Sequence, residues 1–188
     1  MRDEDIEGAL AFLEAAGRLK DTLRSAHTGA GRRESTAEHT WRLCLMALVF
    51  EDGCGGVDLL RLLKVCLVHD LGEAIGGDVP AVLQREGDGR AARERADLAD
   101  LASPLAPALR AELLALWDEY DAGATKEAVL AKGFDKLETI LQHNQGANPE
   151  GFDYGFNLEY GRERTDAHPM LRAIRAVLDE GTKARMGA

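Results

Sequence analysis

Residues 57–70 read Val57-Asp-Leu-Leu-Arg-Leu-Leu-Lys-Val-Cys-Leu-Val-His-Asp70, and this stretch indicates the architecture of the whole chain. Most positions from Val57 to Val68 are apolar, which predicts a helix buried on most of its sides. The helix ends at His69 and Asp70. An unpaired charge beside so apolar a stretch is costly unless a metal ion or a partner compensates it. Burial of the His69-Asp70 pair would therefore need a metal ion or a partner that compensates its charge.

The chain bends directly after this helix and begins another helix well before it. Residues 72–77 are rich in glycine and Pro80 follows, which predicts a turn that carries Asp78. Upstream, Ser35-Thr-Ala-Glu38 matches a capping box after the glycine-rich loop 28–32. His39 is therefore expected in the first turn of a helix that runs to about Glu51.

Apolar residues at helical spacing predict further helices on both sides of this centre. We expect them from residue 6 to about Arg24, from Gln84 to Leu101, after Pro104 and Pro107, after the N-cap Thr125, and from Pro169 to just before Gly181. Residues 146–165 are expected to be irregular. No alternating strand pattern is found, so the expected fold class is all-α, a helical bundle in a single domain over residues 1–188.

Composition supports this expectation and limits the possible partners. A chain of 188 residues suits one domain, and only 5% aromatic residues imply a core of Leu, Ala and Val, which favours helices. The formal charge of −10 repels a phosphate backbone, so we expect no duplex nucleic acid and no membrane surface as partner. A small phosphate ester can still bind through a metal ion and a few arginines.

Localisation is predicted to be cytoplasmic. The three cysteines, Cys44, Cys54 and Cys66, show no CxxC spacing and are expected to be reduced. The first residues lack the pattern of a signal peptide, and the apolar run 44–50 is too short to span a bilayer.

From the residues alone, a metal site is only the leading hypothesis. His69-Asp70 could be a helix-end cap, His39 could be a solvated or satisfied core histidine, and Asp135 beside two lysines could be a surface charge. No spacing rule links these positions.

Three segments taken together resemble the HD-domain phosphohydrolases, and within them the 5′-deoxynucleotidase branch. The segments are Arg33-Glu-Ser-Thr-Ala-Glu-His39, Val68-His-Asp-Leu-Gly-Glu-Ala-Ile-Gly-Gly-Asp78 and Phe134-Asp-Lys-Leu-Glu138. The resemblance covers residues 18–142, followed by a C-terminal loop and helix at about 143–182. It implies a helical bundle that often assembles as a homodimer.

The resemblance also implies a metal site and its surroundings. His39, His69, Asp70 and Asp135 would ligate one divalent transition metal, for which Mn²⁺, Co²⁺, Fe²⁺ and Zn²⁺ all suit mixed imidazole and carboxylate ligands. Such a metal lowers the pKa of a bound water from near 16 to about 7–9. The other implied site residues are Glu73 and Asp78 for proton transfer, and Arg24 and Arg33 for the phosphate.

The implied activity is release of phosphate from (deoxy)nucleoside 5′-monophosphates. The branch commonly has a tryptophan after the phosphate-contacting arginine, whereas this chain has Ser25-Ala-His27, which leaves the base and the sugar of the substrate open. A pyrophosphohydrolase acting on nucleoside triphosphates or alarmones is the alternative, followed by a non-catalytic nucleotide-binding domain and a di-iron oxygenase. For the aromatic residues within 144–165, loop packing is favoured over base stacking.

Overall fold

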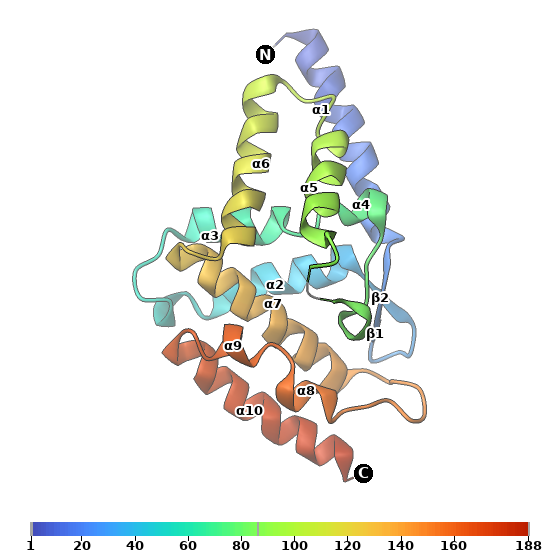
Figure 1. The fold of residues 1–188 in the computed structure, drawn as a ribbon, viewed down its shortest axis with the longest axis vertical. Coiled ribbons are helices and arrows are strands. Elements are labelled where there is room, and N and C mark those ends of the chain that lie inside the picture. The colour runs from blue at the N-terminus through green and yellow to red at the C-terminus, as the bar shows by residue number, and fades with distance from the viewer. Residues whose placement is uncertain (1, 86, 188) are drawn as a thin grey trace.

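The computed structural model describes residues 2–85 and 87–187, and several of its helices pack around one central helix, α7 (Lys126–Gln145) (Figure 1). Helices α2 (Thr36–Val49), α3 (Leu59–Val68), α6 (Pro107–Ala122) and α10 (Pro169–Met186) all contact α7. Because α7 is surrounded in this way, Phe134 and Leu137 are fully buried. The predicted all-α class is confirmed.

Further elements complete the fold. The remaining helices are α1 (Asp3–Ala16), α4 (Glu73–Gly76), α5 (Arg90–Leu101), α8 (Phe156–Glu159) and α9 (Arg162–Thr165), with 3₁₀ turns η1 (Gly17–Lys20), η2 (Glu51–Gly53) and η3 (Ala81–Leu83). Within the described ranges, no helix is both long and apolar enough to cross a membrane.

Three predicted helix starts, those of α2, α7 and α10, are confirmed by their first residues and caps. Ser35 accepts the backbone N–H of Glu38, and the Glu38 carboxylate accepts the backbone N–H of Ser35 at 2.9 Å, so the capping box before α2 is complete. Thr125 caps α7 by accepting the N–H of Ala128. Pro169 occupies the first turn of α10, where its missing N–H costs nothing.

A two-stranded hairpin was not predicted. Strand β1 (Leu23–His27) pairs antiparallel with β2 (Arg33–Ser35), and the expectation of a helix to Arg24 was wrong because α1 ends at Ala16. Strands this short carry too little alternation to be recognised. The hairpin matters for the site because β1 contacts α7 and thereby carries Arg24 towards it.

Two predicted helix ends also differ from the structure. Helix α5 begins at Arg90 instead of Gln84, directly after Gly89, whose φ of +74° lies outside the helical region. Helix α10 continues through Gly181 to Met186. A Cβ at Gly181 would lie 3.2 Å from Asn144 Nδ2, so glycine there permits close packing of α10 on α7 and is not a stop signal.

Candidate functional site

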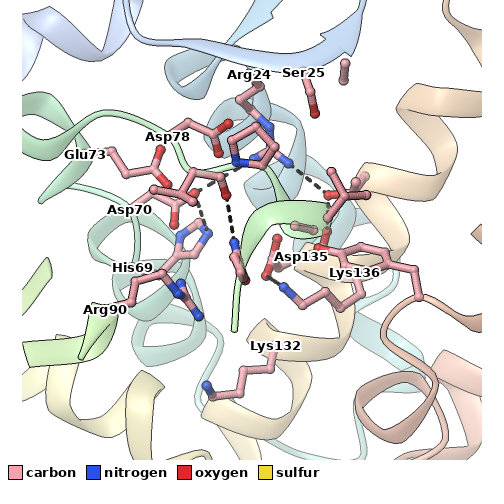
Figure 2. A pocket seen from close by; sticks show the side chains of 18 of the residues that line it. Arg24, Ser25, His69, Asp70, Glu73, Asp78, Arg90, Lys132, Asp135 and Lys136 are labelled. Carbon is pink, nitrogen blue, oxygen red and sulfur yellow. Dashed lines mark hydrogen bonds and ion pairs between the residues drawn. The ribbon is translucent and has the colours of Figure 1, made fainter. Parts of the chain in front are cut away.

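Most of the predicted site residues surround one cavity of about 330 Å³ (Figure 2). Those that line it are Arg24, His69, Asp70, Glu73, Asp78 and Asp135. They come from β1, from the residues directly after α3, from α4 and the turn after it, and from α7. The chain thus gathers residues separated by more than a hundred positions in the sequence into one space.

His39 lies beneath this cavity with no exposed surface. Its Nε2 atom is 3.3 Å from Asp135 Oδ1 and 3.7 Å from Asp70 Oδ2. Asp70 Oδ2 is in turn 2.9 Å from His69 Nε2. Helices α2, α3 and α7 therefore bring all four predicted metal ligands together.

The hydrogen bonds of the two histidines leave their Nε2 atoms available. His39 Nδ1 contacts a carboxylate oxygen of Glu138, and His69 Nδ1 lies 2.7 Å from the carbonyl oxygen of Cys66. Because these oxygens accept, each Nδ1 carries the proton and each Nε2 of a neutral ring presents its lone pair. Neither Nε2 has a well-aligned hydrogen bond within the described residues, although both are buried.

This donor set fits a divalent cation. Ligating atoms of His39, His69 and Asp70 all lie within 4.8 Å of one another. Burial opposes ionisation of Asp70, yet the neighbouring His69 lowers the pKa of its carboxyl group. Two imidazole nitrogens and ionised carboxylates around one point are typical of a transition-metal site.

Asp135 is held by two donors. The hydroxyl of Tyr120 and the ammonium of Lys136 each lie 2.9 Å from Oδ2. Despite burial, the charge of Lys136 holds the pKa of Asp135 well below its usual range. Because Oδ2 is occupied, Oδ1 is the oxygen that faces His39.

Glu73 and Asp78 occupy the turn beside Asp70. Glu73 begins α4, and Thr36 Oγ1 donates to its carboxylate at 2.9 Å. Gly77, with a φ of +77°, bends the chain between the two acidic residues. Burial, together with the charges of Asp70 and Asp78, raises the pKa of Glu73 to about 9, and burial also raises the pKa of Asp78.

The two predicted phosphate-binding arginines lie in different environments. Arg24 is largely buried in the cavity wall, where it donates to Thr139 Oγ1 at 2.9 Å and lies 3.9 Å from Asp70 Oδ2. Arg33 is exposed and is not among the described residues that line the cavity. Its guanidinium instead donates to the backbone carbonyls of Leu23 at 2.8 Å and Arg24 at 2.7 Å. These two hydrogen bonds thus stabilise the backbone of strand β1 at Arg24.

A charged network behind His39 was not predicted. Glu138 is fully buried, contacts His39 Nδ1 and accepts from Arg42 Nε at 2.7 Å. Although burial and the Arg24 charge favour the neutral ring, the carboxylates of Glu138 and Asp135 raise the pKa of His39 to about 9. A cation that binds Nε2 would therefore have to displace a proton from it. Glu138 lies three residues after Asp135, so helical spacing could have identified it.

Glu34 belongs to the same network. It forms a second close group with His39 and Glu138, but Arg42 lies 3.7 Å from Glu34 and also binds Glu138. Arg24 Nε also lies 3.5 Å from Glu34, so two guanidinium groups already face the two carboxylates. This second group is therefore an ion-pair network and not a cation site.

Comparison with known proteins agrees with this geometry. The profile of the HD domain matches residues 16–175. The chain is 33% identical over 138 residues to the 5′-deoxynucleotidase HDDC2 of Homo sapiens, covering 72% of this chain and 67% of that protein. It is 28% identical over 187 residues to the protein of the same name from Dictyostelium discoideum, covering 93% and 98%.

A solved structure has the same fold over nearly the whole chain. It is a predicted metal-dependent phosphohydrolase from Magnetospirillum magnetotacticum, with a TM-score of 0.80 and 28% identity, covering 96% of this chain and 97% of that one. Three findings agree: the HD profile matches most of the chain, the fold is shared, and the histidines and aspartates lie close together. The chain belongs to the HD-domain family of metal-dependent phosphohydrolases.

Proposed function

We propose that the chain releases inorganic phosphate from (deoxy)nucleoside 5′-monophosphates. The observation that supports this most directly is the approach of His39, His69, Asp70 and Asp135 to one point beside a buried arginine. The relatives named 5′-deoxynucleotidase support the substrate class.

In this proposal, His39, His69, Asp70 and Asp135 hold one divalent cation. Mn²⁺, Co²⁺, Fe²⁺ and Zn²⁺ all suit these donors. When bound, such a cation supplies Lewis acidity and makes a water molecule more acidic. Arg24 binds the phosphoryl oxygens, because its guanidinium is buried in the cavity wall and keeps its charge there. Arg33 acts on the phosphate only indirectly, by fixing the backbone of Arg24.

We assign proton transfer to the two carboxyl groups of the turn. Glu73 orients or deprotonates the attacking water, and Asp78 protonates the leaving 5′-oxygen. Both groups line the cavity next to Asp70, and burial raises the pKa of each, which favours the protonated form that a general acid needs. A cation held by the four ligands would lower the pKa of Glu73 again and favour the carboxylate that a base needs. The two roles could be exchanged, and mutagenesis distinguishes them.

A phosphate-release assay tests the proposal. Protein stripped of metal and reloaded with each of the four cations is offered deoxynucleoside 5′-monophosphates, 3′-monophosphates and 5′-triphosphates. We expect inorganic phosphate from the 5′-monophosphates and little from the 3′-isomers. Pyrophosphate from triphosphates, with monophosphates left intact, would instead establish the pyrophosphohydrolase alternative.

We further propose that the protein is a homodimer. Four apolar side chains lie along one outer face of α2, with exposed fractions of 64% for Trp41, 37% for Leu45, 45% for Leu48 and 74% for Val49. A second copy of the chain is the partner that would cover such a face. Light scattering of the parent protein and of Trp41→Glu tests this. We expect a dimer that the substitution weakens, and a monomeric parent would refute it.

A further inference from the structure

The cavity has an aromatic wall supplied by the segment 152–160 near the C-terminus. Three of the four aromatic side chains in this segment, Phe152, Phe156 and Tyr160, line the same cavity as the candidate metal ligands, and each is half-buried. The fourth, Tyr154, does not line this cavity but a neighbouring groove with Arg185 and Met186, and its ring meets that of Phe152 edge to face with centroids 4.9 Å apart. We propose that Phe152, Phe156 and Tyr160 form the subsite that stacks on the nucleobase of the substrate, an inference that rests on the proposed function.

The wall is connected to the candidate metal site through two contacts. Lys136 Nζ is 2.9 Å from Asp135 Oδ2 and lies 5.2 Å from the centre of the Tyr160 ring. Tyr160 stacks on Phe156, with ring centroids 4.9 Å apart and an angle of 29° between the planes. A substrate whose phosphate lies at the metal ligands therefore has aromatic surface next to it.

The wall is held in place by a buried arginine. Arg175 is 2% exposed, and its guanidinium donates to the backbone carbonyls of Asn157 at 2.6 Å, Leu158 at 2.7 Å and Tyr160 at 2.8 Å. These bonds fix the backbone between the rings. Because the rings are positioned before a ligand arrives, little conformational entropy is lost on binding.

Phe152 is fixed from the other side. Its ring meets that of His143 edge to face, with centroids 4.9 Å apart and an angle of 71° between the planes. His143 is itself buried and bonds Asn157 Oδ1 through Nδ1 at 2.7 Å. The aromatic wall therefore rests on α7 through His143 as well as on α10 through Arg175.

Aromatic rings that are half exposed inside a cavity are suited to a flat apolar ligand. Every nucleobase presents such a face, so stacking binds bases without requiring one particular hydrogen-bonding pattern. The subsite predicts a strong preference for nucleotides over sugar phosphates, with tolerance among the bases. Ser25 follows Arg24 in this chain, so no aromatic side chain is available directly after that arginine. The aromatic wall would supply the contact to the base from the C-terminal segment instead.

The test compares a nucleotide with the same phosphate ester lacking its base. Phe156→Leu and Phe152→Leu are assayed on deoxynucleoside 5′-monophosphates and on 2-deoxyribose 5-phosphate. Tyr154→Leu is the matched control for Phe156→Leu, because it removes an aromatic ring of the same segment that lies outside the cavity. It is no control for Phe152→Leu, because the ring of Tyr154 packs against that of Phe152. We expect kcat/KM on the nucleotides to fall roughly 5- to 150-fold in the first two variants, the equivalent of losing one stacked base. Activity on 2-deoxyribose 5-phosphate should stay at the parent level.

Calorimetric titration with a deoxynucleoside, which has no phosphate, gives a second reading that does not depend on turnover. The parent and Tyr154→Leu should bind it, and Phe156→Leu should bind it with a correspondingly weaker Kd. Equal losses of activity on both phosphate esters, or unchanged nucleoside binding in Phe156→Leu, would refute the base subsite. If the parent hydrolyses no phosphate ester, the proposed function fails, while nucleoside binding still decides whether the aromatic wall takes a base.

Discussion

The hydroxyl of Tyr120 lies 2.9 Å from Asp135 Oδ2 and donates to it. The same ring packs against His69 with centroids 4.9 Å apart, so one side chain of α6 touches two candidate metal ligands. Because Oδ2 is engaged, Asp135 presents Oδ1 towards His39, from which it is 3.3 Å away. Tyr120 therefore fixes the orientation of a ligand without being one.

We predict that Tyr120→Phe weakens metal binding about 10- to 100-fold, the usual cost of removing a group that orients a ligand. Because the ring and its packing on His69 are retained, the loss of metal affinity measures the effect of the hydroxyl alone. Titration of stripped protein with Zn²⁺ or Mn²⁺ measures it. Tyr154→Phe is the control, since that hydroxyl bonds Arg185 and Asn148 away from the cavity. An unchanged Kd would mean that Lys136 alone suffices to orient Asp135.

The second prediction concerns the metal content. Elemental analysis of purified protein should find about one transition-metal ion per chain, because the four candidate ligands form a single group. Asp70→Ala should lose it, since Asp70 Oδ2 lies 2.9 Å from His69 Nε2 and 3.7 Å from His39 Nε2. Asp121→Ala, which removes another carboxylate lining the same cavity, should keep the ion. Equal metal affinity in Asp70→Ala and the parent would show that the site is assigned to the wrong residues.

The third prediction separates the roles of the two acidic residues in the turn. Glu73→Ala and Asp78→Ala should retain the metal but lose roughly 100- to 10,000-fold in kcat, as expected for groups that transfer protons. On p-nitrophenyl phosphate, whose leaving group needs no proton, Asp78→Ala should cost much less than on a nucleotide. Glu73→Ala should cost about the same on both.

Different results would change the assignment. Metal loss in either variant would make that residue a ligand. Equal losses of Asp78→Ala on the two substrates would remove it from the role of general acid.

Much of the helical core could be predicted because its signals are local. The capping box at Ser35 places His39 in the first turn of α2, and apolar spacing places Asp135 on α7. Gly181 was misinterpreted because its significance is tertiary: it lets α10 approach Asn144. A helix stop and a close contact between helices both favour glycine, and the sequence does not distinguish them.

The site was predictable only as far as its residues lie in recognisable motifs. Glu138 lies in such a motif, but its partner Arg42 comes from a different helix, α2. The position of Tyr120 has no local signal, because its contacts with His69 and Asp135 depend on how α6 packs on α3 and α7. Likewise, Phe152, Phe156 and Tyr160 are four residues apart, as on a helix, but α8 covers only Phe156–Glu159, so the spacing does not reveal their place. Their position in the cavity wall follows from the path of the chain between α7 and α10.

The last prediction is a dependence of stability on pH that originates at His143. Burial and, to a lesser degree, the charge of Arg24 lower the pKa of this imidazole below its ordinary value of 6.5, against the opposing effect of the bond to Asn157. The unfolded chain therefore binds the proton more readily than the folded chain. The contribution of neutral His143 to the free energy of unfolding is fully present above pH 6.5 and is lost as the pH falls through the lowered pKa.

Urea unfolding of the parent and of His143→Gln between pH 8 and pH 5 measures this contribution. At pH 8 the imidazole is neutral in both the folded and the unfolded state, so the difference there reports packing and hydrogen bonding only. Between pH 7 and pH 5 the free energy of unfolding should fall more steeply in the parent than in His143→Gln, because only the parent has a buried imidazole to protonate. Parallel curves over this range would show that His143 is protonated as easily in the folded protein as in the unfolded chain, and would contradict the burial that lowers its pKa.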